Sequence, residues 1–158
     1  MSREPTGFDR ADRLEQLNGL LGGFARGLGL RYVVAEPEEI AAELEVDARH
    51  LQPYGLVHGG VYASMIESVC SAGTALHVMS QGQSAVGLEN TTSFLKAVRE
   101  GVLRCTARPL VRGRRTHVWN AEIHDDRGRL VATGRVRMMV LEGRDRVAGE
   151  AIRLQEGG

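Results

Sequence analysis

Aromatic residues make up only 4% of this 158-residue chain, which leaves little material for a large aromatic stacking pocket. No apolar run reaches the ~18 residues that cross a bilayer, so we expect no membrane-spanning helix. Neither charge sign dominates, because 20 basic residues balance 20 acidic ones. A dedicated nucleic-acid-binding protein would carry a basic excess, so we expect no nucleic-acid partner. The charged residues 1–5 precede no apolar stretch, which predicts no secretory signal and a cytoplasmic location.

Cysteines and metal-ligand patterns are equally sparse. The two cysteines, Cys70 and Cys105, lie in apolar sequence surroundings and are predicted to be buried free thiols of a reducing compartment. No second histidine or cysteine lies at metal-ligand spacing from His58. The sequence therefore predicts no metal site.

Hydrophobic periodicity divides the chain into helical and strand-forming parts. Apolar residues recur at helical spacing from Arg10 to about Arg26, although three glycines within this stretch weaken the predicted helix. A longer and mostly apolar helix is expected from Val61 to Met79. Alternating apolar and polar residues predict strands at 30–35, 40–46, 85–97, 103–108, 117–123 and 130–140. An Asp-Asp-Arg-Gly sequence at 125–128 predicts a hairpin turn.

These elements predict a single α+β domain at residues 30–141. A helical segment at 1–29 precedes it, and a charged tail at 142–158 follows and is expected to be peripheral or helical. The four strands after the long helix are joined by short turns, so we expect them to be antiparallel neighbours. A helix this apolar needs cover over most of its circumference, and the sheet is therefore expected to curl around it.

The run from Leu51 to Gly60, called the glycine loop below, places two glycines at the start of the long helix. The first N–H groups of a helix lack internal partners, and the absence of a Cβ at Gly59 lets a ligand approach them closely. Within the helix, Glu67 is the single carboxylate of an apolar run, and Ser71 lies one turn further on the same face. A donor N–H and a carboxylate are the groups needed to transfer an acyl group to water. The alternatives are a tight turn at the glycines and a carboxylate that only pairs with a neighbour.

The spacing of these two groups constrains how they could act together. Gly59 and Glu67 are eight residues apart, which corresponds to about 12 Å along a helix. Both groups therefore cannot contact one carbonyl in the same chain. If they cooperate, Glu67 must come from a second copy of the helix, and the sequence predicts a site shared across a symmetric dimer interface.

Residues 52–60, Gln-Pro-Tyr-Gly-Leu-Val-His-Gly-Gly, followed by Glu67 nine residues after the histidine, resemble the hotdog-fold acyl-CoA thioesterases. The likeness is greatest to the 4-hydroxybenzoyl-CoA thioesterases of the Arthrobacter type, with the phenylacetate-pathway thioesterases as near neighbours. It covers residues 30–141 and includes the stretch 113–119. The resemblance implies a sheet wrapped around one helix, hydrolysis of an aryl- or medium-chain acyl-CoA to acid and free CoA, no cofactor, and homodimers or dimers of dimers.

The resemblance also implies roles for individual residues. Gly59 would polarise the thioester carbonyl through its N–H, and Glu67 of the facing subunit would act as nucleophile or general base. Gln52 would place the thioester or the attacking water. Ser71 stands where that branch has a threonine, so the hydroxyl is kept and a methyl is lost. The further candidates for binding substrate or CoA are His58, Gly60, Asn90, Arg114, Arg115 and Thr116.

Two other functions stay open at this point. A dehydratase or hydratase acting on 3-hydroxyacyl-CoA would use a histidine together with an acid, but His58 lies in the glycine loop rather than in the usual context of that histidine. A non-catalytic acyl-CoA-binding module would need neither Glu67 nor Gln52, and the presence of both residues argues against it.

Overall fold

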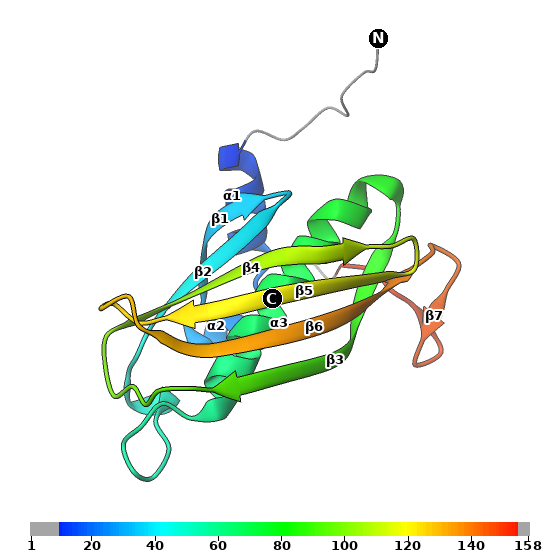
Figure 1. Cartoon of the computed structure of the whole chain (residues 1–158). Coiled ribbons are helices and arrows are strands. Elements are labelled where there is room, and N and C mark those ends of the chain that lie inside the picture. Colours follow the sequence, from blue (N-terminus) through cyan, green and yellow to red (C-terminus); the bar gives the residue numbers. More distant parts are fainter. Residues whose placement is uncertain (1–9, 155–158) are drawn as a thin grey trace.

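The computed structural model of the chain describes residues 10–154 and consists of a sheet wrapped around one long helix, α3 (Gly59–Val78) (Figure 1). Six antiparallel strands form the sheet in the order β1-β2-β4-β5-β6-β3. The strands are β1 (Arg31–Glu36), β2 (Glu39–Glu45), β3 (Ser84–Phe94), β4 (Val102–Arg112), β5 (Thr116–His124) and β6 (Leu130–Leu141). The predicted α+β architecture of an antiparallel sheet around one central helix is therefore confirmed.

Helix α3 is buried over much of its circumference because its side chains are small and apolar. Trp119 on β5 lies across Gly73, where any Cβ would collide with the indole ring. The indole N–H donates a hydrogen bond to Thr74 Oγ1 at 2.8 Å, which satisfies both buried polar groups. Cys70 on the helix and Cys105 on β4 are buried and free, as predicted. These contacts fix the position of α3 against the sheet.

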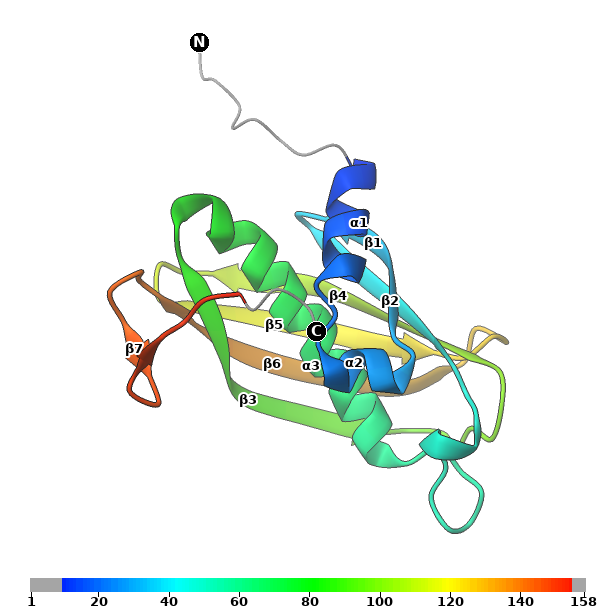
Figure 2. The ribbon, with the colours of Figure 1, turned by 180° about the vertical axis from the view of Figure 1, so that it is seen from behind.

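The predicted helix from Arg10 to Arg26 is in fact two helices, α1 (Arg10–Gly19) and α2 (Gly23–Leu28). The glycines that weakened the prediction break the helix, because glycine costs about 1 kcal/mol relative to alanine in a helix interior. Figure 2 shows α1 beside β1 and α2 against α3. Asn18 anchors α1, since its side-chain amide exchanges hydrogen bonds with the backbone N–H and carbonyl of Tyr32 at 2.9 and 3.1 Å.

The predicted pairing of the strand at 85–97 with the next strand is wrong. β3 pairs with β6 and forms one edge of the sheet, whereas β4 pairs with β2 and β5. β3 ends at Phe94 rather than at residue 97, and residues 95–101 are a crossing segment rather than the end of a strand and a hairpin turn. This segment runs past the start of α3. There the Val57 N–H donates to Val98 O at 2.8 Å, and the Leu95 N–H donates to Val131 O at 2.8 Å. The segment thus joins the two sides of the sheet beneath the glycine loop.

Strand β3 contains a β-bulge at Leu88. Gly87 pairs with Met138 and Glu89 with Arg137, so Leu88 is an extra residue on this strand. Successive strand residues point to opposite faces, and one extra residue reverses that alternation. Gly87 before the bulge and Asn90 after it consequently both face α3.

The remaining segments include one confirmed turn and a tail that is not helical. Residues 125–129 form the predicted hairpin turn, with the Gly128 N–H donating to Asp125 O at 3.0 Å. The tail forms a small hairpin of β7 (Arg146–Val147) and β8 (Glu150–Ala151), and its last four residues lie outside the described part. Residues 1–9 of the predicted N-terminal segment also lie outside it. Among residues 10–154, no helix is long and apolar enough to cross a membrane.

Candidate active site

Glu67 is half-buried on α3, and side chains from α3 and β3 hold its carboxylate. Ser71 Oγ lies 3.4 Å from Glu67 Oε1, and Asn90 donates from Nδ2 to Glu67 Oε2 at 3.0 Å. The same Asn90 nitrogen donates to Ala63 O at 3.1 Å. Both of these partners can only accept, so the amide nitrogen must face them. Thr92 Oγ1 lies 2.6 Å from Asn90 Oδ1 and holds the other end of the amide.

Gly87 provides the space for this carboxylate. A Cβ at position 87 would lie 2.5 Å from Glu67 Oε1, so any side chain there would displace the acid. The prediction from sequence missed Gly87 and Thr92. A glycine in a strand interior marks a bulge or a close approach, and that signal pointed to Gly87.

The start of α3 leaves one backbone donor unused. His58 is the N-cap residue, and its Nδ1 accepts a hydrogen bond from the Gly60 N–H at 2.8 Å. The His58 carbonyl accepts from the Val61 N–H at 2.9 Å. Among residues 10–154, no group accepts from the Gly59 N–H. Gly59 therefore presents a free donor at the electropositive end of the helix, while His58 and Gly60 stabilise the helix start.

Gln52 lies in a loop that is closed on itself and tied to the crossing segment. Its backbone accepts from the Gly55 N–H and donates to Leu56 O, each at 2.8 Å, and its Oε1 accepts from the Tyr54 N–H. Arg99 Nη1 donates to Tyr54 O at 2.9 Å and Gly55 O at 3.1 Å. Gly55 has a φ of +72°, a conformation that favours glycine. The loop thereby holds Gln52 beside the start of α3.

Gly59 and Glu67 line different pockets of the chain. A pocket of about 320 Å³ contains Gly59 and Gln52, and a pocket of about 440 Å³ contains Glu67 and Asn90. Phe94, the last residue of β3, lines both pockets and separates them. The structure thus brings Glu67, Ser71 and Asn90 together, and it places Gln52 with Gly59 in a second group.

Comparison with known proteins decides what this arrangement belongs to. The family model of the thioesterase superfamily matches residues 54–132. The 1,4-dihydroxy-2-naphthoyl-CoA hydrolase of Escherichia coli is 36% identical over 136 residues, which are 85% of this chain and 98% of that protein. The chain belongs to the thioesterase superfamily.

Two solved structures extend this relationship to the fold. A Mycobacterium tuberculosis protein, Rv1847, which carries the name of an esterase, is 43% identical and has a TM-score of 0.74 over 77% of this chain and 98% of that one. Thioesterase HI1161 of Haemophilus influenzae is 29% identical and has a TM-score of 0.80 over 89% and 96% of the two chains. The thioesterase described here therefore has the hotdog fold and is a thioester hydrolase, as the resemblance implied.

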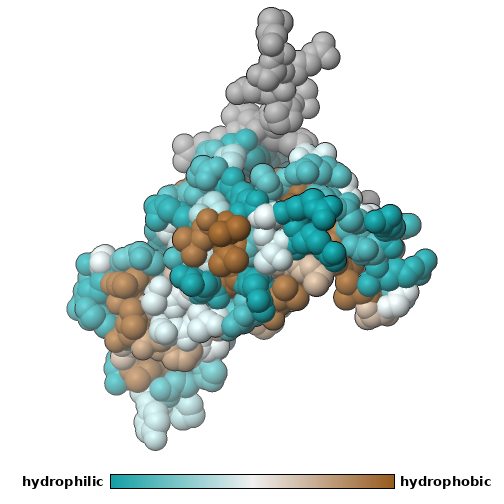
Figure 3. Space-filling view, turned by 45° about the vertical axis from the view of Figure 1, so that its right-hand side comes forward, coloured by the Kyte–Doolittle hydropathy of each residue, from teal (hydrophilic) through white to brown (hydrophobic). Residues whose placement is uncertain are grey.

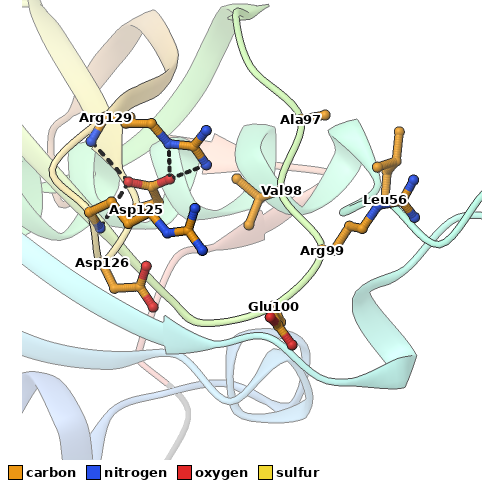
Figure 4. Close-up of a pocket in the computed structure, with 9 residues that line it drawn as sticks. Leu56, Ala97, Val98, Arg99, Glu100, Asp125, Asp126 and Arg129 are labelled. Carbon is orange, nitrogen blue, oxygen red and sulfur yellow. Dashed lines mark hydrogen bonds and ion pairs between the residues drawn. The ribbon is translucent and has the colours of Figure 1, made fainter.

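A further pocket of the thioesterase, of about 480 Å³, lies beside the crossing segment (Figure 4). Its most buried acid, Asp125, accepts from the backbone N–H of Arg127 at 3.1 Å and from the N–H and Nε of Arg129 at 2.9 and 2.7 Å. Burial raises the pKa of Asp125, but the hydrogen bonds from Arg129 and Arg127 outweigh this effect and lower it. Asp125 therefore stays ionised and stabilises the hairpin turn.

Arg114, Arg115 and Thr116, for which the resemblance implies CoA binding, lie together where β4 turns into β5, and Thr116 is the first residue of β5. Arg99 lies just before β4, at the other end of a strand roughly 33 Å long. Because Val57 pairs with Val98, the start of α3 is at the Arg99 end of β4. Within one chain, the turn at 114–116 is thus far from Gly59.

Proposed function

We propose that this thioesterase hydrolyses aryl- or medium-chain acyl-CoA esters at a site built by two protomers. Gly59 and Gln52 of one protomer face Glu67 of its partner. The observation that carries this proposal is that α3 holds the two reacting groups at separate positions along its length. The helix offers a free N–H at Gly59 and a positioned carboxylate at Glu67, but it places them in separate pockets.

The chemistry follows from these two groups. The thioester oxygen accepts a hydrogen bond from the Gly59 N–H, which stabilises the negative charge that develops as the carbonyl carbon becomes tetrahedral. Glu67 of the partner either removes a proton from water or attacks the carbon directly and forms an anhydride that water then cleaves. The carbon–sulfur bond breaks, and the CoA thiolate leaves and takes up a proton. Asn90 and Ser71 hold the carboxylate, and Gln52 positions the thioester or the water.

A second copy fits the free edge of β3. This strand pairs only with β6, and its other edge has no partner among residues 10–154. Leu88 and Phe94 on β3 are 46% and 58% exposed, and Phe24 on α2 is 71% exposed. Figure 3 shows that the face of the molecule drawn there carries apolar patches set in a mostly polar surface. Antiparallel pairing of two β3 edges would bury these exposed apolar side chains. It would also align the two α3 helices in opposite directions.

Coenzyme A is supported as the leaving group by the chemistry of a relative. The E. coli protein described above is named for an acyl-CoA substrate with an aromatic acyl group. In a dimer formed by antiparallel pairing of the two β3 edges, the β4–β5 turn of one protomer would lie toward the Gly59 end of the other. Arg114, Arg115 and Thr116 of that turn are therefore assigned to the phosphates of CoA.

The capping role of His58 argues against the dehydratase or hydratase alternative. Its Nδ1 is committed to the Gly60 N–H, and its ring lies at the surface. The dehydratase or hydratase alternative needs a histidine paired with an acid. Among the described residues, Glu67 contacts Ser71 and Asn90 and pairs with no histidine.

Hybrid dimers test the shared site. Glu67→Gln and Gln52→Ala variants are unfolded together, refolded and assayed by release of free thiol from benzoyl-CoA and decanoyl-CoA. Each variant alone should lose most activity. The mixture should recover about one quarter of wild-type activity, because half of the dimers are hybrids and each hybrid has one intact site of two.

The controls separate the activity from its location. Refolded wild-type protein sets the maximum recovery, and size-exclusion chromatography with light scattering gives the oligomeric state. A mixture no more active than its parents would place Gln52 and Glu67 in one chain and overturn the shared site. If the wild-type protein releases no thiol from either ester, the acyl-CoA assignment is wrong.

A further inference from the structure

Phe94 occupies an unusual position for an aromatic residue that is 58% exposed. It ends β3 on the face that the bulge turns toward α3, and its ring lies directly against Gly59. A Cβ at Gly59 would come within 2.6 Å of two carbons of the Phe94 ring. The phenyl group therefore covers the residue that carries the free N–H.

A second aromatic ring fixes Phe94 in this place. The centroid of the Tyr62 ring is 5.9 Å from that of Phe94, with the planes tilted by 38°. This separation is typical of favourable aromatic pairs. Tyr62 is 3% exposed and lies one turn after Gly59, and helical side chains lean back over the preceding turn. Tyr62 thus supplies a rigid support for a residue that is otherwise at the surface.

Phe94 also forms the boundary between the two pockets. The pocket at Gly59, of about 320 Å³, is lined by Tyr62 and by the apolar side chains of Leu56 and Leu95. Beyond the Phe94 ring lies the pocket of about 440 Å³ that contains Glu67 of the same chain. Among the residues that line these two pockets, Phe94 is the one that both pockets share.

We propose that Phe94 sets the size of the acyl group that this thioesterase accepts. Resting on the proposed function, this inference places the acyl group in the pocket between Tyr62 and Phe94 when its carbonyl is at Gly59. The phenyl ring closes the far side of that pocket. Among the acyl-CoA esters that it hydrolyses, the enzyme consequently favours compact acyl groups, such as a single aromatic ring or butanoyl, over longer ones such as decanoyl.

Substitutions at Phe94 that change only its size test this inference. Values of kcat/KM are measured for benzoyl-CoA, butanoyl-CoA and decanoyl-CoA with wild-type protein and with Phe94→Ala, Phe94→Leu and Phe94→Trp. Opening the wall should raise the ratio of decanoyl-CoA to butanoyl-CoA hydrolysis by about tenfold in Phe94→Ala, in the range that single pocket contacts give. Phe94→Leu should give a smaller rise, and Phe94→Trp should lower the ratio.

Leu110→Ala is the matched control, because it truncates another exposed apolar residue, which lies toward the far end of β4. It should leave the ratio unchanged. Thermal unfolding of each variant establishes that it is folded, and Phe94→Leu and Phe94→Trp keep the test valid if Phe94→Ala is unstable. A folded, active set of Phe94 variants with the wild-type ratio would overturn this inference alone. Failure of the wild-type protein to cleave any of the three esters would overturn the proposed function and this inference with it.

Discussion

Replacing Gly87 by alanine should separate catalysis from folding in this thioesterase. The added Cβ would lie 2.5 Å from Glu67 Oε1, whereas ordinary contacts of a Cβ begin at 3.4 Å. The carboxylate must therefore retreat by about 1 Å, a misplacement that costs roughly a hundredfold in rate when a reacting group is involved. We expect kcat to fall by that factor. Stability should hold or rise slightly, because alanine is favoured over glycine in a strand by roughly 0.5–1 kcal/mol.

A thiol-release assay with a chromogenic disulfide measures this loss. Both cysteines of the protein are buried, and burial raises the pKa of each thiol, so neither should contribute to the signal. Gly27→Ala is the control, because a Cβ there has no neighbour within 4 Å. In a Glu67→Gln background, Gly87→Ala should cause no further loss, since it acts only through the carboxylate. Wild-type kcat in Gly87→Ala, or an added loss in the double variant, would refute the reasoning.

Two further predictions concern residues outside the carboxylate group. Arg99→Ala removes two hydrogen bonds to the loop that holds Gln52 and should lower kcat/KM about tenfold. Arg127→Ala is the control and should leave kcat/KM unchanged. Equal losses in the two variants would disprove a selective role of Arg99. Burial, then His77 and Arg112, lower the pKa of His117 below its ordinary value of 6.5. The folded protein therefore binds fewer protons than the unfolded chain below that pH, and its stability should fall as the pH drops. Urea unfolding at about pH 7 and pH 5 should show a smaller fall for His117→Gln but not for His124→Gln.

Much of the fold follows from local patterns in the sequence. The alternation of apolar and polar residues located β4, β5 and β6, and the long helix was predicted within two residues of its start and one of its end. These elements are predictable because one face of each packs on the core and the other does not. The glycines between α1 and α2 lowered the helix propensity of this stretch but did not predict a break, because local propensity cannot distinguish a strained helix from two short ones.

The errors arise where tertiary contacts override local signals. The sequence predicts that residues 95–97 end a strand and that a short turn follows, and only the hydrogen bonds to Val57 and Val131 make residues 95–101 a crossing segment. Asn90 was predicted as a candidate for binding substrate or CoA, but its hydrogen bond to Glu67 joins two elements that are far apart in the sequence, and its contact with Thr92 depends on the geometry of the strand. Phe94 carries no signal of its own, because an exposed phenylalanine at a strand end has no pattern that places it over a helix start.

The bulge at Leu88 gives β3 one residue more than the stretch of β6 with which it pairs. Gly87 and Asn90 are therefore three residues apart in the sequence and still face the same side of the sheet. Deleting Leu88 would leave a regular ladder in which Gly87, Glu89 and Asn90 keep Met138, Arg137 and Val136 as their partners, so Asn90 would still face the helix. An alignment of this strand with a homologue that lacks the bulge must therefore open a one-residue gap at Leu88, because without the gap Asn90 is matched with a residue that points outward.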